Sequence, residues 1–305
     1  MDRAAYKALL DKIASDSRHL VQIQELLSNG PTRTLSISSS SIVVEIEELN
    51  CKFVWEPGDP RTAVAALVAS GKYESTETSL LIYLAKHSNV ILDIGANVGY
   101  YAVLLGLEIG ETGQVYSFEP LPSSFSQLQT NVQINNLDSK VQCIPFALSD
   151  SSGFATLHVP KVSGTSATSM QNLHPDEANS SFSIETQKLD DVVVGRDIGK
   201  IDLIKIDVEG AERLVFQGGW QSIQKSLPVI FAELLRKWSA GFGYHPSQVV
   251  DEFKSLGYRC FAVGTKLELV ENITEETEET NFLFLTNSPE HSLLENGLRS
   301  IGLIH

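Results

Sequence analysis

Residues 91–103 read ILDIGANVGYYAV: an apolar run, an aspartate, two glycines, and then aromatic and aliphatic residues. This order predicts a buried strand that ends near Asp93, a turn through Gly95 and Gly99, and a helix that begins near residue 100. Free amides at a helix N-terminus carry partial positive charge and usually bind anions. A carboxylate at the mouth of such a turn therefore requires an explanation.

The sequence around this stretch alternates strand-like and helical segments. VILDIG is followed by a helix near 100–108 and QVYSFE by a helix from 123 to about 136, and VQCIPFA ends the first half. The pattern resumes with IDLIKID, a short helix, PVIFAEL and a helix near 246–256. Such alternation predicts βαβ units and a parallel sheet.

Two stretches depart from the alternation. Residues 161–181 are rich in Ser, Thr and Gly, and we expect a flexible segment that acts as a lid. The last two strand-like runs, YRCFAV and NFLFLT, have no helix between them, which predicts an antiparallel hairpin at the sheet edge. We expect the Glu-rich tract 268–280, within that connection, to be a solvated loop.

The first 74 residues have a different pattern. Residues 2–29 alternate charged and apolar side chains at helical spacing, and residues 33–58 alternate as one or two strands. We assign residues 1–74 to an N-terminal helix and strand cap, and residues 75–305 to the main α/β domain. The first helix is a candidate for homodimerisation or for substrate selection.

Composition and charge limit the partners. A net charge of -15 and the lack of a basic stripe argue against nucleic acid. The amphipathic opening has no continuous apolar stretch, so we expect neither a signal peptide nor a membrane span. The expected location is the cytoplasm.

The glycine spacing separates this turn from a dinucleotide site. Such sites use G-x-G-x-x-G followed by an acid about 20 residues later, whereas here Asp93 precedes Gly95 and Gly99. A carboxylate repels a pyrophosphate but suits S-adenosylmethionine, which carries an ammonium and a sulfonium. The next strand ends in YSFEP, where Glu119 can accept hydrogen bonds from both ribose hydroxyls. The structural alternatives are an Asp that caps the turn and a solvated Glu beside Pro120.

Several motifs resemble the FkbM-type S-adenosylmethionine-dependent methyltransferases. They are DIGANVGYYAV at 93–103, VYSFEP at 115–120, ALSD at 147–150, KLDDV at 188–192, IDLIKIDVEGAERLVFQGG at 201–219 and PVIFAEL at 228–234. The resemblance implies a Rossmann-like class I methyltransferase fold, with a mostly parallel seven-stranded sheet and an antiparallel last strand. It also implies methyl transfer to a hydroxyl of a sugar, glycolipid or polyketide-type acceptor.

The cofactor-binding roles follow from the positions of the motifs. Gly95 and Gly99 are expected to leave room for the methionine part of the cofactor, whose carboxylate the amides around Ala96 to Tyr100 would receive. The strand end at 147–150 is expected to contact the adenine. The predicted cofactor-binding residues are Asp93, Gly95, Ala96, Asn97, Gly99, Tyr100, Glu119, Pro120, Ala147, Leu148 and Asp207.

The segment KIDVEGAE places three charged residues on one face, Lys205, Asp207 and Glu209. We expect Asp207 beside the sulfonium, and Glu209 and Glu233 to hold or deprotonate the acceptor hydroxyl. A structural salt bridge from Lys205 to one of these acids is the alternative. His245 is the rival base, although a residue that begins a helix before Pro246 fits it as well. We expect Glu212 on a helix surface.

Other functions stay open at this level. A magnesium or calcium ion bound by Asp207, Glu209 and Glu233 would orient a diol acceptor and lower its hydroxyl pKa. A protein that binds the cofactor without catalysis is a second alternative. An NAD-dependent dehydrogenase is disfavoured, since its pyrophosphate would lie beside Asp93.

Overall fold

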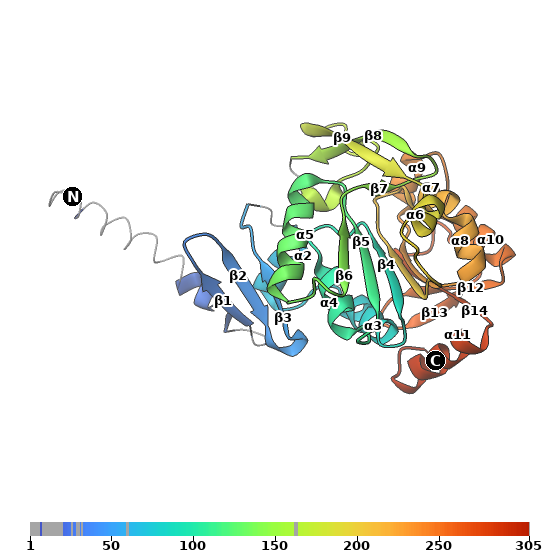
Figure 1. Ribbon diagram of the computed structural model, residues 1–305, viewed down its shortest axis with the longest axis horizontal. Helices are drawn as coiled ribbons and strands as arrows, with labels where there is room; N and C mark the ends of the chain where they lie inside the picture. Colours follow the sequence, from blue (N-terminus) through green and yellow to red (C-terminus); the bar gives the residue numbers. More distant parts are fainter. Residues whose placement is uncertain are drawn as a thin grey trace. The chain divides into compact units, whose positions relative to one another are not determined.

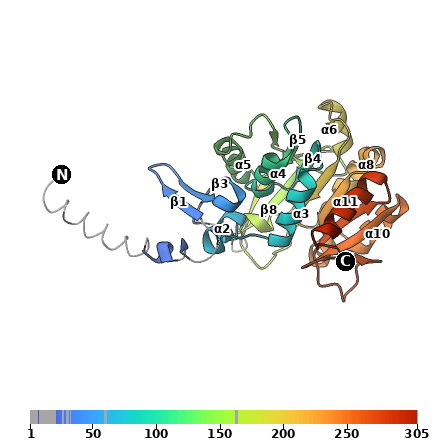
Figure 2. The same cartoon turned by 90° about the horizontal axis from the view of Figure 1, so that it is seen from below.

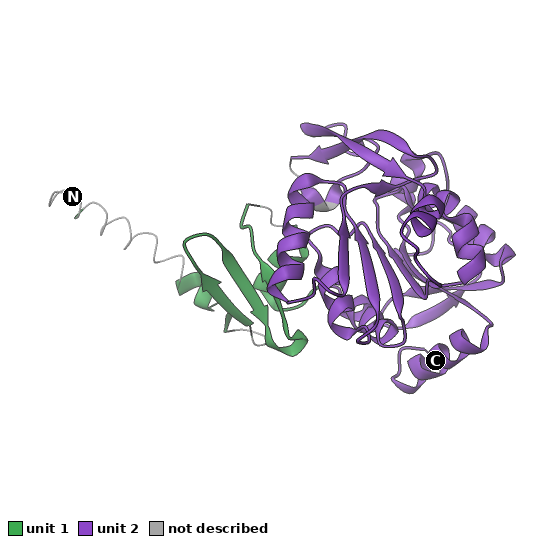
Figure 3. Ribbon diagram, viewed as in Figure 1, with its two compact units in different colours: residues 1–73 green, residues 74–305 purple. Residues whose placement is uncertain are grey.

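The computed structural model describes residues 33–58, 61–161 and 164–304, together with Lys7, Pro31, 21–25 and 27–28. They form two compact units that meet in the sequence between Tyr73 and Glu74 (Figure 3). Residues 21–25 are helical. Most of the helix predicted over 2–29, and with it the candidate dimer contact, lies outside the described residues.

The first unit contains one antiparallel sheet and one helix. Its elements are β1 (Arg33–Ile37), β2 (Ile42–Ile46), the short helix η1 (Glu47–Leu49), β3 (Cys51–Val54) and α2 (Ala63–Ser70). The prediction of one or two strands is wrong, because the serine run makes a turn between β1 and β2. In this turn the Ser38 hydroxyl oxygen accepts hydrogen bonds from the amides of Ser40 and Ser41. Buried Arg33 donates to the carbonyl oxygen of Val68 in α2.

The second unit contains an eight-stranded sheet in the order β13-β12-β14-β11-β10-β4-β5-β6. The strands are β4 (Val90–Ile94), β5 (Gln114–Phe118), β6 (Val141–Ile144), β10 (Leu203–Ile206), β11 (Val229–Glu233), β12 (Tyr258–Val263), β13 (Leu267–Val270) and β14 (Asn281–Thr286). Strands β6, β5, β4, β10 and β11 are parallel neighbours. The predicted Rossmann-like, mostly parallel α/β sheet is therefore confirmed.

The part of the sheet beyond β11, which contains β14, β12 and β13, differs from the sequence prediction in two ways. The last strand, β14, is antiparallel as expected, but it lies between β11 and β12 instead of at the edge. An eighth strand, β13, forms from the start of the Glu-rich tract and pairs with β12. Its apolar residue Leu267 is buried, which composition alone did not indicate.

Helices flank the large sheet in two groups (Figure 1). In one group, α4 (Tyr100–Glu108) packs against α3 (Ser75–Ala85) and α5 (Pro122–Ile134). In the other, α6 (Leu189–Gly195), α7 (Glu212–Gly218) and α8 (Trp220–Ser226) pack together, while α10 (Pro246–Ser255) contacts β12. The core between sheet and helices includes Ile94, Ile206, Phe216 and Phe253. None of the helices in the described ranges has the length and apolar content needed to cross a lipid bilayer.

A second, three-stranded sheet follows β6. It consists of β7 (Ala147–Leu148), β8 (Gly153–Pro160) and β9 (Asn179–Gln187) in the order β7-β9-β8. Leu157 and Ile184 face inward and pack with Leu121. The Ser/Thr/Gly-rich stretch predicted as a lid is the connection between β8 and β9, and it contains the short helix η2 (Thr165–Ala167).

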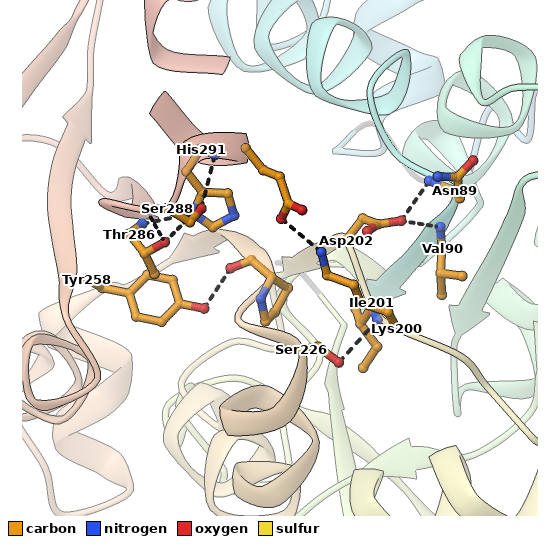
Figure 4. A network of polar contacts seen from close by, with 12 residues as sticks. Asn89, Val90, Lys200, Ile201, Asp202, Ser226, Tyr258, Thr286, Ser288 and His291 are labelled. Carbon is orange, nitrogen blue, oxygen red and sulfur yellow. Dashed lines mark hydrogen bonds and ion pairs between the residues drawn. The ribbon is translucent and has the colours of Figure 1, made fainter. Parts of the chain in front are cut away.

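The amino ends of the parallel strands are held by polar contacts (Figure 4). The Asp202 carboxylate accepts hydrogen bonds from the amides of Asn89 and Val90, which aligns the starts of β4 and β10. Nearby, Thr286 donates its amide hydrogen to the ring of His291 in α11 (Pro289–Ser300). Figure 2 shows α11 next to α3, where the Tyr83 hydroxyl leaves no room for a side chain at Gly297. These contacts therefore hold together the amino ends of the parallel strands and the elements around them.

Candidate active site

A pocket opens at the carboxyl ends of β4, β5 and β10. The empty space in it, with the open mouth included, is about 670 Å³. The connection between β8 and β9, which lies at the same end of the sheet in Figure 1, supplies one wall. The lining residues are Ile94, Gly95, Asn97, Phe118, Glu119, Pro120, Ala147, Leu148, Leu157, Thr165, Thr168, Ser169, Met170, Asp207, Val208, Glu209 and Ala211.

The glycines of the β4–α4 turn are required by neighbouring protein atoms. Gly95 has φ +78°, and a Cβ there would lie 1.8 Å from the carbonyl oxygen of Asp207. Gly99 has φ +87°, and a Cβ there would lie 2.7 Å from Leu128 of α5. Gly95 therefore lets β4 approach the turn after β10, and Gly99 lets α4 approach α5. Gly95 also lines the pocket and Gly99 does not, and the expectation that they leave room for the cofactor stays a prediction.

The amides of this turn have partners inside the protein. Ala96 donates to the carbonyl oxygen of Phe118, and Gly99 donates to that of Ala96. The side chain of Tyr100 is buried, and its hydroxyl hydrogen-bonds to Thr78. Ala96, Gly99 and Tyr100 do not line the pocket, and their contact with the cofactor carboxylate stays a prediction.

Glu119 lies at the end of β5, at the position expected for a ribose ligand. It is buried, and its two oxygens accept hydrogen bonds from the amides of Asn97 (2.9 Å) and Leu121 (2.8 Å). Burial raises the pKa of Glu119 to about 7, although both hydrogen bonds oppose this. Each carboxylate oxygen has a second lone pair, so the two bonds hold the side chain without using up its acceptor capacity.

Asp93 does not face the pocket but forms a buried ion pair. Its Oδ1 lies 3.6 Å from Nζ of Lys205, and the side chain of Asp93 is fully buried. Lys205 Nζ also lies 3.8 Å from Asp207 Oδ2 and donates to the carbonyl oxygen of Gly95. The aspartate therefore balances the charge of a lysine on the adjacent strand, and its contact with the cofactor ammonium stays a prediction.

Burial and charge act in opposite directions on this pair. Burial lowers the pKa of Lys205, but the carboxylates of Asp93 and Asp207 outweigh it and raise that pKa above its usual value. Burial raises the pKa of Asp93, and the charge of Lys205 opposes the rise. Lys205 therefore stays protonated and links β4 to the turn after β10. The alternative of a structural salt bridge from Lys205 is correct for Asp207, whereas the buried partner Asp93 was not among the acids considered for it.

Asp207, Glu209 and Glu233 come together as predicted. One carboxylate oxygen from each lies within 4.8 Å of the others. Burial, together with the charge of Asp207, raises the pKa of Glu209 to about 9 and that of Glu233 to about 11. Glu209 and Glu233 thus carry protons at neutral pH unless a positive charge comes close.

Glu212 is not on a helix surface, as we expected. It is buried, and its Oε1 accepts hydrogen bonds from the amides of Val208 and Gly210, both at 3.1 Å. The hydroxyl of Tyr244 donates to Oε2 at 3.0 Å. Through these hydrogen bonds Glu212 stabilises the turn that carries Asp207 and Glu209.

His245, the rival base, has a structural role. His245 begins α10: its Nδ1 accepts a hydrogen bond from the amide of Ser247 and contacts that residue's hydroxyl. It does not line the pocket, so the helix-cap alternative is correct. His158 contacts Ser181 across the β8–β9 hairpin, and His174 packs against Trp238 of α9 (Arg236–Gly241).

The comparison with known families agrees with this site. The profile of the methyltransferase FkbM domain matches residues 93–260, from the end of β4 into β12. This match covers more than half of the 305 residues. The chain belongs to the FkbM methyltransferase family.

Individual relatives share the middle of the chain. A hexuronic acid methyltransferase, AglP, from Haloferax volcanii is 27% identical over 145 residues, covering 48% of this chain and 56% of that protein. The 31-O-demethyl-FK506 methyltransferase FkbM of Streptomyces tacrolimicus is 32% identical over 162 residues, covering 43% and 59%. The chain thus matches little more than half the length of each relative. The solved methyltransferase FkbM of Methylobacillus flagellatus aligns with a TM-score of 0.39 at 15% identity, covering 65% of this chain and 43% of that one.

Some residues around Lys205 and the pocket lie outside the FkbM motifs, among them Glu74, Ser169 and Met170. Tyr101 donates a 2.6 Å hydrogen bond to Glu74, and its ring lies 5.4 Å from Nζ of Lys205. Glu74 precedes the motifs, and its φ of +41° has no signal in the sequence. Ser169 and Met170 lie in the Ser/Thr-rich stretch, where composition predicts a lid without selecting residues.

Proposed function

We propose that this chain is an S-adenosylmethionine-dependent O-methyltransferase that acts on a hydroxyl of a sugar, glycolipid or polyketide-type acceptor. One observation carries the proposal: Glu119 and Asp207, from the ends of two strands, line the same pocket. This pocket would thus offer one acid to the ribose hydroxyls and another to the sulfonium of the same ligand.

The remaining lining fits the rest of the cofactor. Oδ1 of Asn97 is buried and has no hydrogen-bond partner among the described residues, although Asn97 lines the pocket. A buried acceptor without a donor is costly, so this oxygen suits the ammonium of the methionine part. Ala147 and Leu148 offer an apolar surface for the adenine, next to Pro120.

Methyl transfer itself requires mainly alignment. The acceptor oxygen attacks the methyl carbon, the carbon–sulfur bond breaks, and the hydroxyl proton is released to a base. Glu209 and Glu233 lie near Asp207, where that oxygen would bind. With their raised pKa values both glutamates are protonated at neutral pH and cannot take the acceptor's proton, but a sulfonium would bring positive charge to the cluster, lower these pKa values and favour the ionised form. Cofactor binding would thus favour the ionised glutamate that can act as the base.

The acceptor class rests on the family and its named relatives. One relative is named for a hexuronic acid and the other for the 31-O position of FK506. A hydroxyl-bearing small molecule or glycan is therefore the proposed acceptor. The cytoplasmic location and the lack of a nucleic-acid partner remain predictions from composition.

Two measurements test the proposal. Calorimetry with S-adenosylmethionine and with NAD should show binding of the first alone, because a pyrophosphate would face the acids of the pocket. A screen of hydroxylated acceptors with labelled methyl donor should then give labelled product. Binding without transfer to any acceptor would favour the non-catalytic alternative, and binding of NAD alone would refute the proposal.

Metal-assisted transfer to a diol is the second candidate function. The spacing of the Asp207, Glu209 and Glu233 oxygens, within 4.8 Å, would allow one divalent ion to contact all three. Such an ion would let both glutamates ionise at neutral pH. Turnover in EDTA separates the candidates: an unchanged rate excludes a required ion, and a loss restored by magnesium or calcium supports one.

A further inference from the structure

A serine of the β8–β9 connection, the segment predicted as a lid and called the lid below, contacts the turn after β10 that carries Asp207 and Glu209, called the acidic turn below. The hydroxyl of Ser169 donates a 2.8 Å hydrogen bond to the carbonyl oxygen of Glu209. Ser169 is only 2% exposed, and its backbone exchanges two hydrogen bonds with His158 of β8. The two backbone hydrogen bonds to β8 therefore hold Ser169 in place, independently of the bond that its hydroxyl donates to Glu209.

The contacted residue has an unfavourable backbone conformation. Glu209 has φ +51°, in the left-handed region that residues with a Cβ seldom adopt. Gly210 follows with φ +98°, and a Cβ there would lie 2.8 Å from the backbone of Trp238. Glu212 accepts the amides on either side of Glu209. The hydroxyl of Ser169 binds the carbonyl oxygen of Glu209. Together with the bonds to Glu212, this contact holds the backbone of Glu209, and the backbone sets the direction of the Glu209 side chain.

The lid is also anchored beyond Ser169. The rings of His174 and Trp238 lie 5.1 Å apart, and Leu173 occupies the space that a Cβ at Gly241 would need. Thr168, Ser169 and Met170 line the cofactor pocket together with Glu209. The lid and the acidic turn therefore both form walls of this pocket.

We propose that Ser169 is a positioning residue, whose hydrogen bond to Glu209 couples occupation of the cofactor pocket to the placement of the Glu209 carboxyl. This inference rests on the proposed function, because it assigns the carboxyl to the acceptor hydroxyl. It adds a link between the lid and the proposed base that the motif KIDVEGAE does not contain.

Three variants test the link. Ser169→Ala removes the donor, Ser169→Thr keeps it, and Ser183→Ala removes an exposed hydroxyl from the same hairpin as a matched control. We expect Ser169→Ala to lower kcat by roughly tenfold, the upper value for one hydrogen bond, with little change in KM for S-adenosylmethionine. Ser169→Thr should restore most of kcat, and Ser183→Ala should match the wild type. If the threonine variant does not fold, Ser169→Cys provides the weaker donor.

A second readout does not depend on turnover. Hydrogen exchange of a peptide that covers 203–214 should slow when S-adenosylmethionine is added to the wild type, and should slow less in Ser169→Ala. Wild-type kcat and exchange in Ser169→Ala would overturn the inference, and so would equal losses in the alanine and threonine variants. A wild type that binds the cofactor but methylates no acceptor would instead count against the proposed function, while the exchange experiment would still test the link.

Discussion

The ammonium of Lys205 lies 3.6 Å from the carboxylate of Asp93, and both side chains are buried between adjacent parallel strands. The two residues are directly opposite in the register of β10 and β4. Asp93 therefore has a structural partner 112 positions away in the sequence, and the ion pair connects the glycine turn to the acidic turn.

This pair predicts the stability of three variants. Lys205→Met leaves Asp93 buried without its cation and should lower the free energy of unfolding by about 3–5 kcal/mol. Asp93→Asn should cost less, because Lys205 keeps Asp207 as a partner. The double variant should recover part of the loss, as urea denaturation of all three would show. An Asp93→Asn variant that folds normally but loses cofactor affinity would contradict the buried, structural role.

Gly95→Ala should damage the site through the backbone. The left-handed φ alone costs roughly 1–3 kcal/mol for alanine, and the added Cβ would collide with the carbonyl oxygen of Asp207. We expect a large loss of stability and of cofactor binding, measured by thermal unfolding and calorimetry. Gly199→Ala is the matched control, because nothing lies within 4 Å of a Cβ there.

Glu119→Ala should weaken binding of S-adenosylmethionine by roughly 1.5–3 kcal/mol, the range for hydrogen bonds to charged groups. The amides of Asn97 and Leu121 also lose their acceptor, so the melting temperature should fall. Exposed Glu111→Ala should change neither quantity. Cofactor affinity in Glu119→Ala within calorimetric error of the wild type would exclude a ribose ligand.

Glu209→Gln and Glu233→Gln should keep cofactor affinity and lose about 10²- to 10⁴-fold in rate, since an amide cannot take a proton. Both should fold normally, because the glutamine resembles the protonated acid that each site favours at neutral pH. His245→Gln is the control for the rival base and should lose far less rate. Normal turnover in both glutamine variants would refute these glutamates as the base.

The dependence of rate on pH tests the same assignment. Since the active form of Glu209 is ionised and its pKa is raised to about 9, kcat should rise with pH and level off at or below that value. The sulfonium can only lower this pKa. In Glu209→Gln the rise should disappear. A wild-type kcat that is constant from mildly acidic to alkaline pH would leave Glu209 without a role in proton transfer.

The sequence predicts the elements whose pattern is local. The run through Asp93, Gly95 and Gly99 marks β4, the turn and α4, because a buried strand and positive φ values leave a direct signature. Pocket positions at strand ends, such as Glu119 and Asp207, follow from the same alternation. The FkbM motifs then indicate S-adenosylmethionine as the ligand of these positions.

The errors arise where a distant partner decides the role of a residue. Asp93 and Glu212 look like a ligand acid and a surface acid until Lys205 and the amides of Val208 and Gly210 are placed beside them. Likewise, the Ser/Thr-rich connection gives no sign that Ser169 reaches the turn after β10. Such roles depend on side-chain contacts across the fold, which periodicity does not encode.

The extra strand β13 has a consequence for association between chains. Without it, β12 would be the open border of the sheet, and its mostly buried residues Tyr258–Val263 would offer an apolar template for another chain. β13 has only four residues and carries exposed Glu268, and the acidic tract follows it directly. A short, negatively charged border strand repels a second copy of itself. We therefore expect the Glu-rich tract, which composition marks only as solvated, to disfavour edge-to-edge association.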